Sequence, residues 1–271
     1  MLNCPRRETL VLFAFSAVLS LAVLGARAVA PAPTTPVATI LVYHRFGPKV
    51  ADNMTITTAL FAAHLRYLHD NGYNVVPLRD VVDFLSARKP LPPRAVAITV
   101  DDGHRTVFTE MKPLVERYHV PVTLFIYPSA ISNASYAMSW DQLRALQETG
   151  LFDIQGHTYW HPNFKQEKRR LPQNQFEEFV RSQLTKPREV LKAHLSVTVD
   201  MLAWPFGIYD DELIRVAREI GYVAGVTLDR HPVSASTNAM AMPRYLVTQE
   251  MAGKAFANVL QAGGARSIPN P

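Results

Sequence analysis

Residues 95–103 read Ala-Val-Ala-Ile-Thr-Val-Asp-Asp-Gly, and this stretch decides the fold. Its first six residues form an unbroken apolar run, which is typical of a strand that is buried on both faces of a parallel sheet. The run stops at two aspartates and a glycine, a composition that favours a turn. The stretch therefore predicts a buried parallel strand that ends in two adjacent carboxylates.

Similar apolar runs recur along the chain and alternate with amphipathic segments. We predict strands at residues 39–44, 75–76, 95–100, 122–126, 152–155, 201–204, 223–227 and 245–248. We predict helices at residues 58–71, 78–87, 106–118, 139–148, 174–195 and 210–220. This alternation indicates an α/β barrel of seven or eight parallel strands covered by helices. A doubly wound open sheet is the alternative, but no glycine-rich phosphate loop follows any of these strands.

The composition excludes several classes of protein. Of the 271 residues, 48% are hydrophobic and 19% are charged, which excludes a chain that is mainly disordered. The single cysteine, Cys4, excludes an intramolecular disulfide and a metal site built from cysteines. Nine histidines remain for a transition-metal site. The net charge is +5 and the chain has no run of like charges, so we expect no nucleic-acid partner.

The first 28 residues have the pattern of a secretory signal peptide. Arg6 and Arg7 precede an apolar run from Leu10 to Gly25, and residues 26–28 read Ala-Arg-Ala. An uncleaved membrane anchor is the alternative, although the apolar run is shorter than the ~20 residues that a spanning helix needs. We therefore expect export to the periplasm or the exterior of a bacterial cell, with no stable membrane span after cleavage.

A proline-rich linker at residues 29–36 is expected to lead into one folded domain at residues 37–265. Removal of the signal, which carries a net charge of +2, would leave a net charge near +3. Such a mild charge does not imply an anionic partner. The sequence leaves the oligomeric state open.

Polar side chains follow several predicted strands directly. His44, the pair Asp101 and Asp102, and the pair His157 and His161 all stand at carboxyl ends of strands, which open on one face of a barrel. The two histidines at i and i+4 are expected on one helical turn. With Asp102 they would form a site of two histidines and one carboxylate that leaves positions free for water and substrate.

Three motifs resemble those of the polysaccharide deacetylases of carbohydrate esterase family 4, also called the NodB homology domain. The family motif T-F-D-D-G appears as T-V-D-D-G at residues 99–103. The motif H-[S/T]-x-x-H appears as H-T-Y-W-H at residues 157–161. Only the end of the third motif is present, as W-P-F-G at residues 204–207. The resemblance covers residues 37–250, nearly the whole chain after the linker.

The resemblance implies a distorted (β/α) barrel and the metal-assisted hydrolysis of N-acetyl or O-acetyl groups on a sugar. It implies that Asp101 is the general base and that Asp102, His157 and His161 bind a divalent metal. Zinc is expected first, with cobalt, nickel, manganese and iron as alternatives. The backbone N–H of Phe206 would donate to the oxyanion.

Two departures from the family pattern affect the expected roles. The arginine of the third motif, which orients the base, is missing, and Arg244 is a candidate to replace it. The fifth motif, which supplies the general acid, is one residue too long where it ends at His231. His44 competes for that role, because a Tyr-His pair at the end of the first strand resembles the deacetylases of β-1,6-linked poly-N-acetylglucosamine. We therefore expect an acetylated glucosamine polysaccharide of the envelope or exopolysaccharide as substrate.

Aromatic residues beside these motifs are candidates for contact with the sugar. Trp204 and Pro205 of the third motif and Tyr159 of the second are placed at the substrate, although packing explains aromatic residues equally well. Two other functions remain open. One is a glycan-binding relic without catalysis, and the other is a mononuclear iron oxygenase, which uses the same type of ligand set.

Overall fold

The computed structural model describes residues 1–2 and 37–262. The predicted signal peptide at residues 1–28, the linker at residues 29–36, Cys4 and the last three residues of the predicted domain lie outside the described residues, apart from Met1 and Leu2. Among the helices of the described part, none is both long enough and apolar enough to cross a membrane.

Eight strands form one sheet in which every pairing is parallel. Seven of them follow the order β10-β1-β5-β6-β7-β8-β9, and β4 pairs with β5 beside this path. Their bounds are β1 Ala38–Tyr43, β4 Asn74–Val75, β5 Ala95–Asp101, β6 Val122–Ile126, β7 Phe152–Gly156, β8 Met201–Ala203, β9 Ala224–Val226 and β10 Tyr245–Leu246. The parallel sheet predicted from the apolar runs is confirmed.

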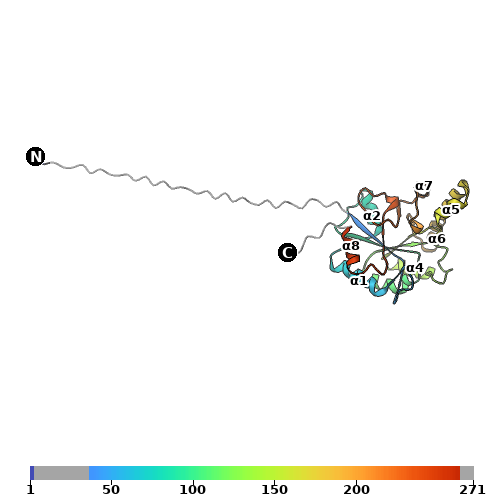
Figure 1. Ribbon diagram of the computed structural model, residues 1–271, viewed down its shortest axis with the longest axis horizontal. Helices are drawn as coiled ribbons and strands as arrows, with labels where there is room; N and C mark the ends of the chain where they lie inside the picture. Colours follow the sequence, from blue (N-terminus) through green and yellow to red (C-terminus); the bar gives the residue numbers. More distant parts are fainter. Residues whose placement is uncertain (3–36, 263–271) are drawn as a thin grey trace. The chain divides into compact units, whose positions relative to one another are not determined.

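Helices surround the strands, which lie at the centre of Figure 1. The predicted helices correspond to α1 Thr58–Asp70, α2 Leu78–Leu85, α3 Lys112–Tyr118, α4 Trp140–Glu148, α6 Gln173–Leu195 and α7 Asp211–Ile220. Several elements were not predicted from the sequence: α5 Phe164–Arg170, α8 Lys254–Ala262 and a two-stranded parallel sheet of β2 Arg45–Gly47 and β3 Thr55–Thr57. The short 3-10 turns η2 Pro205–Gly207 and η3 Ala239–Ala241 were not predicted either.

The helix predicted at residues 106–118 begins as a π-helix, η1 Val107–Met111, before α3 continues it. Pro113 accounts for the change, because it has no N–H and its ring clashes with the carbonyl four residues earlier. The Lys112 N–H bonds instead to the Val107 carbonyl, five residues back.

The sheet curls into a barrel that is incompletely closed. In the part of the chain that the structure describes, β9 and β10 do not pair with each other. A single residue between them, Met242, bridges to Val226 and exchanges backbone hydrogen bonds of 2.8 Å with Gly225 and Thr227. The segment that then becomes β10 pairs with β1, so it joins both edges of the sheet. This curled sheet is the predicted distorted barrel rather than the doubly wound alternative.

Alternate residues of β5 face opposite sides of the sheet, as the two-residue period of a strand requires. Val96, Ile98 and Val100 belong to the large core cluster, which includes residues of most of the helices. Ala95 and Ala97 belong to the second, smaller cluster on the interior face of the sheet, which holds residues of other strands such as Met201 and also the buried residues of α2. The same parity carries the interior face on through Thr99 to Asp101, so the first aspartate points into the barrel.

Candidate active site

A cavity of about 320 Å³ opens at the carboxyl ends of the strands. It is lined by side chains from the ends of β1, β5, β6 and β7, from β2, from the turn before β3, and from the loops after β8 and β9: His44, Arg45, Met54, Asp101, Asp102, Tyr127, His157, His161, Trp204, Phe206 and Leu228. The structure therefore brings together most of the site residues named from the sequence.

Asp101 lies at the base of the cavity and is held by Arg244. The guanidinium donates to both carboxylate oxygens, at 2.8 Å from Nη1 and 2.7 Å from Nη2. Arg244 is fully buried, and it also donates to Thr99 Oγ1 and to the Thr227 carbonyl. Burial alone would raise the pKa of Asp101, but the charge and hydrogen bonds of Arg244, with His157, lower this pKa to about 2.

Asp102 adopts a left-handed backbone conformation, with φ of 76°. The Gly103 N–H bonds to the Asp101 carbonyl at 3.1 Å, so the three residues form a γ-turn. The turn sends the second carboxylate away from Arg244 and toward the histidines. Burial raises the pKa of Asp102, in contrast to its neighbour. The two aspartates thus occupy different environments, as expected from adjacent positions at the end of a strand.

The expectation that His157 and His161 share a helical turn is wrong. Residues 157–161 form a loop in which Thr158 and His161 have φ of 63° and 62°. Pro162 disfavours a helical conformation at the residue before it. Buried Gln183 of α6 accepts from the Trp160 N–H at 3.2 Å, and Thr158 Oγ1 accepts from the His161 N–H at 3.1 Å. The loop, not a helix, brings the two imidazoles together.

Asp102, His157 and His161 form a cluster that fits a metal ion. His157 Nδ1 donates to the Ala203 carbonyl at 2.7 Å, which directs Nε2 into the cavity. Asp102 Oδ1 lies 3.7 Å from this Nε2 and 3.8 Å from Nε2 of His161. One ligand atom from each residue lies within 4.8 Å of the others. Two nitrogens and one oxygen at such spacing suit an ion with bonds of about 2.0–2.2 Å.

Burial favours the neutral imidazoles that metal binding requires. It lowers the pKa of His157 to about 3 and also lowers the pKa of His161.

The two candidates for the general acid lie in different places. His44 follows β1 directly and lines the cavity. Its Nδ1 is buried and has no hydrogen-bond partner among the residues that the structure describes. Burial lowers the pKa of His44, although Asp101 and Asp102 act in the opposite direction. His231 is exposed and does not line the cavity. Its Nδ1 lies 3.1 Å from the adjacent Pro232 carbonyl oxygen.

The third motif supplies two residues to the cavity. Trp204 is buried, and its indole N–H donates to the Met240 carbonyl at 2.8 Å, so this hydrogen bond fixes the orientation of the ring. Phe206 is 56% exposed with φ of 58°, and its ring centroid lies 4.6 Å from that of His161. Pro205 is buried and Tyr159 lies under Lys186, so neither lines the cavity.

Four cavity residues were not predicted from the sequence: Arg45, Met54, Tyr127 and Leu228. A sequence signal existed for three of them. Tyr127 comes directly after a predicted strand, the position that singled out His44, and Arg45 directly follows His44. Leu228 opens the segment that resembles the fifth motif and ends at His231. Met54 lies in the turn before β3, and no sequence pattern indicated it.

The fold of this chain is similar to that of several solved structures. The Streptococcus pyogenes deacetylase PplD, solved in complex with acetate, aligns with a TM-score of 0.74 and 20% identity over 84% of this chain and 99% of its own. IcaB from Ammonifex degensii aligns with a TM-score of 0.72 and 24% identity over 84% of this chain and 98% of its own. These likenesses establish the curled barrel as the fold of this chain.

Comparison of sequences identifies the family. The poly-beta-1,6-N-acetyl-D-glucosamine N-deacetylase of Staphylococcus epidermidis is 24% identical over 208 residues, which is 75% of this chain and 72% of the relative. The model of the polysaccharide deacetylase family matches residues 88–225, a span that contains all three motifs described above. This chain belongs to the polysaccharide deacetylase family.

Proposed function

We propose that this protein is a metal-dependent hydrolase that removes N-acetyl groups from a polysaccharide rich in N-acetylglucosamine. One observation carries the proposal: the carboxylate of Asp101, fixed by Arg244, lies beside the cluster of Asp102, His157 and His161 in a single cavity. Amide hydrolysis needs a proton acceptor for water, an electrophilic site for the carbonyl and a proton donor for the amine.

Asp102, His157 and His161 would hold the divalent ion, with zinc first among the candidates because of the mixed nitrogen and oxygen donors. Such an ion lowers the pKa of a bound water to about 7 and polarises a carbonyl. The unused ring nitrogen of His157 is already fixed on the Ala203 carbonyl, so the imidazole is oriented before an ion arrives.

Asp101 would accept a proton from the attacking water. Its pKa of about 2 keeps the carboxylate ionised at neutral pH, and the two bonds from Arg244 fix its orientation. The carboxylate lies 3.9 Å from His157 Nε2, which places the proton acceptor next to the metal cluster. Arg244 would in this way perform the role of the arginine that the third motif lacks, because it orients the base.

His44 would donate a proton to the leaving nitrogen of the sugar, and the Phe206 N–H would donate to the carbonyl oxygen as it gains negative charge. His44 is supported by its place in the cavity and by its unpartnered Nδ1. His231 is the weaker candidate, because it is exposed outside the cavity.

The similarity to the Staphylococcus epidermidis relative supports β-1,6-linked poly-N-acetylglucosamine as the class of substrate. The experiment that tests the function measures acetate release, with and without added metal ions, from N-acetylglucosamine polymers, peptidoglycan and acetylxylan. We expect release from the glucosamine polymer, and a loss of at least about 10²-fold in Asp101→Asn. Release from none of these substrates would contradict the proposal.

The same experiment separates the two alternatives. A glycan-binding relic would bind the polymer equally well with and without Asp101→Asn and would release no acetate. An iron oxygenase would consume oxygen, whereas hydrolysis would not. For the metal site, His157→Ala should reduce the bound metal to background, with exposed His194→Ala as the control that retains it.

We propose further that residues 1–28 act as a cleaved signal, so that the enzyme works outside the cytoplasm. Arg6 and Arg7, the apolar run from Leu10 to Gly25 and the Ala-Arg-Ala end support this proposal. N-terminal sequencing of the native protein should give a start at or near Val29. A start at Met1 in membrane fractions would support the uncleaved anchor instead.

A further inference from the structure

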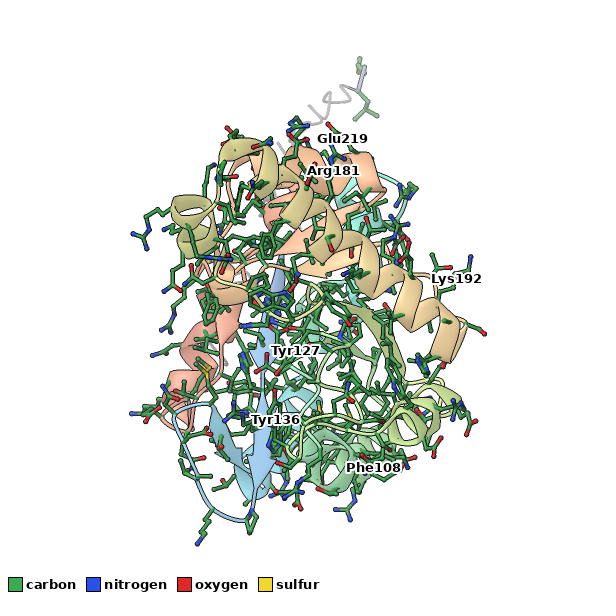
Figure 2. All side chains as sticks on the ribbon, turned by 90° about the vertical axis from the view of Figure 1, so that its right-hand side faces the viewer. Phe108, Tyr127, Tyr136, Arg181, Lys192 and Glu219 are labelled. Carbon is green, nitrogen blue, oxygen red and sulfur yellow. The ribbon has the colours of Figure 1, made fainter. Side chains whose placement is uncertain are left out.

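A wall of aromatic rings continues from the catalytic cavity to the protein surface. The ring centroid of Tyr127 lies 5.5 Å from that of His161, and Tyr127 lines the cavity. The hydroxyls of Tyr127 and Tyr136 are hydrogen-bonded at 2.8 Å, and the two residues lie near each other in Figure 2. The ring of Tyr136 lies nearly parallel to that of His104, at 6.2 Å between centroids. We call Tyr127, Tyr136 and His104 the aromatic wall.

The aromatic wall is anchored to the turn that carries the two aspartates. The Tyr136 carbonyl accepts from the Arg105 N–H at 2.8 Å, and the Met138 N–H donates to the Gly103 carbonyl at 3.0 Å. His104 pairs with Ala137 in an antiparallel bridge. His104 Nδ1 is 2.8 Å from Thr106 Oγ1, which fixes the imidazole. The wall is thus held at a constant position relative to Asp102.

Tyr136 is 41% exposed and does not line the catalytic cavity. A large aromatic side chain that is rigidly held but open to solvent offers both an apolar face and a hydroxyl group. The pyranose ring of a sugar has an apolar face and hydroxyl groups at its edge, so the two are complementary. The cavity of about 320 Å³ is at the small end of ligand sites, so the neighbouring sugars of a polymer must lie outside it.

We propose that the aromatic wall is a subsite for the sugar unit next to the one that loses its acetyl group. This proposal rests on the proposed function, because it takes the polymer as the substrate. The neighbouring sugar packs its ring against Tyr136, and its hydroxyl or acetamido group bonds to the paired hydroxyls of Tyr127 and Tyr136. Within that pair one hydroxyl donates to the other, which leaves one O–H free to donate to the sugar.

The subsite makes activity depend on the length of the substrate. The experiment compares kcat/KM for β-1,6-linked N-acetylglucosamine oligomers of one to five units with kcat/KM for an aryl acetate, which has no neighbouring sugar. In the unmodified protein, kcat/KM for the pentamer divided by kcat/KM for the aryl acetate should exceed the same ratio for the monomer. We call these two values the pentamer ratio and the monomer ratio. Tyr136→Ala should lower the pentamer ratio about tenfold, mainly through KM, because it removes the ring.

Tyr136→Phe keeps the ring and removes the hydroxyl, so we expect a smaller loss of about threefold. It also keeps the proposal testable if Tyr136→Ala does not fold. The control is Tyr73→Ala, which removes an aromatic residue that contacts Tyr67 and Arg94 beside β4, away from the cavity. This control should keep the ratio of the unmodified protein.

No dependence on length in the unmodified protein, or an unchanged pentamer ratio in both Tyr136 variants, would overturn the subsite while leaving the deacetylase function intact. If the unmodified protein released no acetate from any sugar, the proposed function would fail. The affinity of the protein for the pentamer would then test the subsite. Calorimetry with the pentamer on Asp101→Asn should then give a Kd about tenfold higher when Tyr136→Ala is added. An equal Kd would overturn the subsite.

Discussion

Asp101 and Asp102 are neighbours in the chain, yet their pKa values shift in opposite directions. Both are desolvated, which raises the pKa of each carboxyl. Only Asp101 receives two hydrogen bonds from a buried guanidinium, and this contact reverses the shift. A buried ion pair of this kind is costly to disrupt, because removal of one partner leaves an unpaired charge in the interior. The chemistry at the residue scale therefore depends on Arg244.

Arg244→Met should reduce kcat/KM by about 10²-fold or more and should shift its dependence on pH. With Arg244, the pKa of Asp101 is about 2, so this carboxylate stays ionised throughout pH 5–8. Without it, burial raises the pKa, and activity should fall as the pH decreases through the new value. The pH profile of aryl acetate hydrolysis measures the shift. Arg244→Lys should restore part of the rate but not the two-bond geometry, and an unshifted profile in Arg244→Met would contradict this role.

His44→Ala should slow hydrolysis of an N-acetylated sugar by about 10²–10⁴-fold, with metal binding unchanged. The loss on an aryl acetate should be far smaller, because a phenolate leaves without a proton. Rates on both substrates for His44→Ala and His231→Ala give the comparison. A selective loss on the amide in His231→Ala, and none in His44→Ala, would reverse the two roles.

At the scale of elements, the site depends on two short segments with unusual backbone geometry. The γ-turn after β5 turns the second aspartate away from the first, and the loop after β7 brings two histidines together without a helix. Left-handed conformations at Asp102, Thr158, His161 and Phe206 all occur in these segments or in the third motif. Such conformations cost free energy. In the loop after β7, the side-chain oxygens of Gln183 and Thr158 accept from the Trp160 and His161 N–H groups and help to hold the backbone.

Gly103→Ala should destabilise the fold by about 3 kcal/mol, because it combines two costs. Gly103 has φ of 76°, and an added Cβ would lie 3.0 Å from Ile126 Cδ1 and 3.2 Å from Ile131 Cδ1. The control is Gly72→Ala at the end of α1, where φ is 64° but no atom lies within 4 Å of the added Cβ. That change should cost only the backbone strain of about 1 kcal/mol. Urea unfolding measures the free energy of unfolding of both variants. An equal decrease in Gly103→Ala and Gly72→Ala would mean that packing at Gly103 is unimportant.

At the scale of the whole molecule, a buried histidine links three parts of the fold. His64 of α1 donates from Nε2 to the Met251 carbonyl at 2.7 Å. Its Nδ1 then accepts from the Tyr43 hydroxyl of β1 at 3.2 Å, which requires the neutral ring. The imidazole stacks on Phe256 of α8 at 3.9 Å between centroids. The first strand, the first helix and the last helix therefore meet at one uncharged side chain.

Stability should decrease in mild acid because of His64. Burial lowers its pKa from 6.5 to about 4, so the unfolded chain takes up the proton first as the pH falls. The free energy of unfolding should lose about 2 kcal/mol from this group between pH 7.5 and pH 5. Urea unfolding at pH 7.5 and pH 5 should show a smaller decrease in the free energy of unfolding for His64→Gln than for the unmodified protein. The control His69→Gln, at an exposed position of the same helix, should behave like the unmodified protein. An identical loss in all three would assign the acid sensitivity to other groups.

The sequence by itself determined the parallel sheet, its covering helices and the set of residues that stand at strand ends. These features follow from local patterns. An apolar run indicates a buried strand, and the polar residue after it indicates where the strand leaves the core. The cluster of Asp102, His157 and His161 could be named in this way, since each residue stands at or just after the end of a strand. The same rule applied to Tyr127 would have found a further cavity residue.

Only the tertiary structure decided which distant residues meet. Arg244 pairs with Asp101 across 143 positions of sequence, and no local pattern specifies that contact. The curl of the sheet produces it, because the segment after Met242 returns to β1 and carries the arginine into the barrel interior. The exposure of His231 outside the cavity was likewise not specified by any local pattern. Periodicity shows which face of an element is buried, whereas the curvature of the sheet and the paths of the loops determine what each buried face touches.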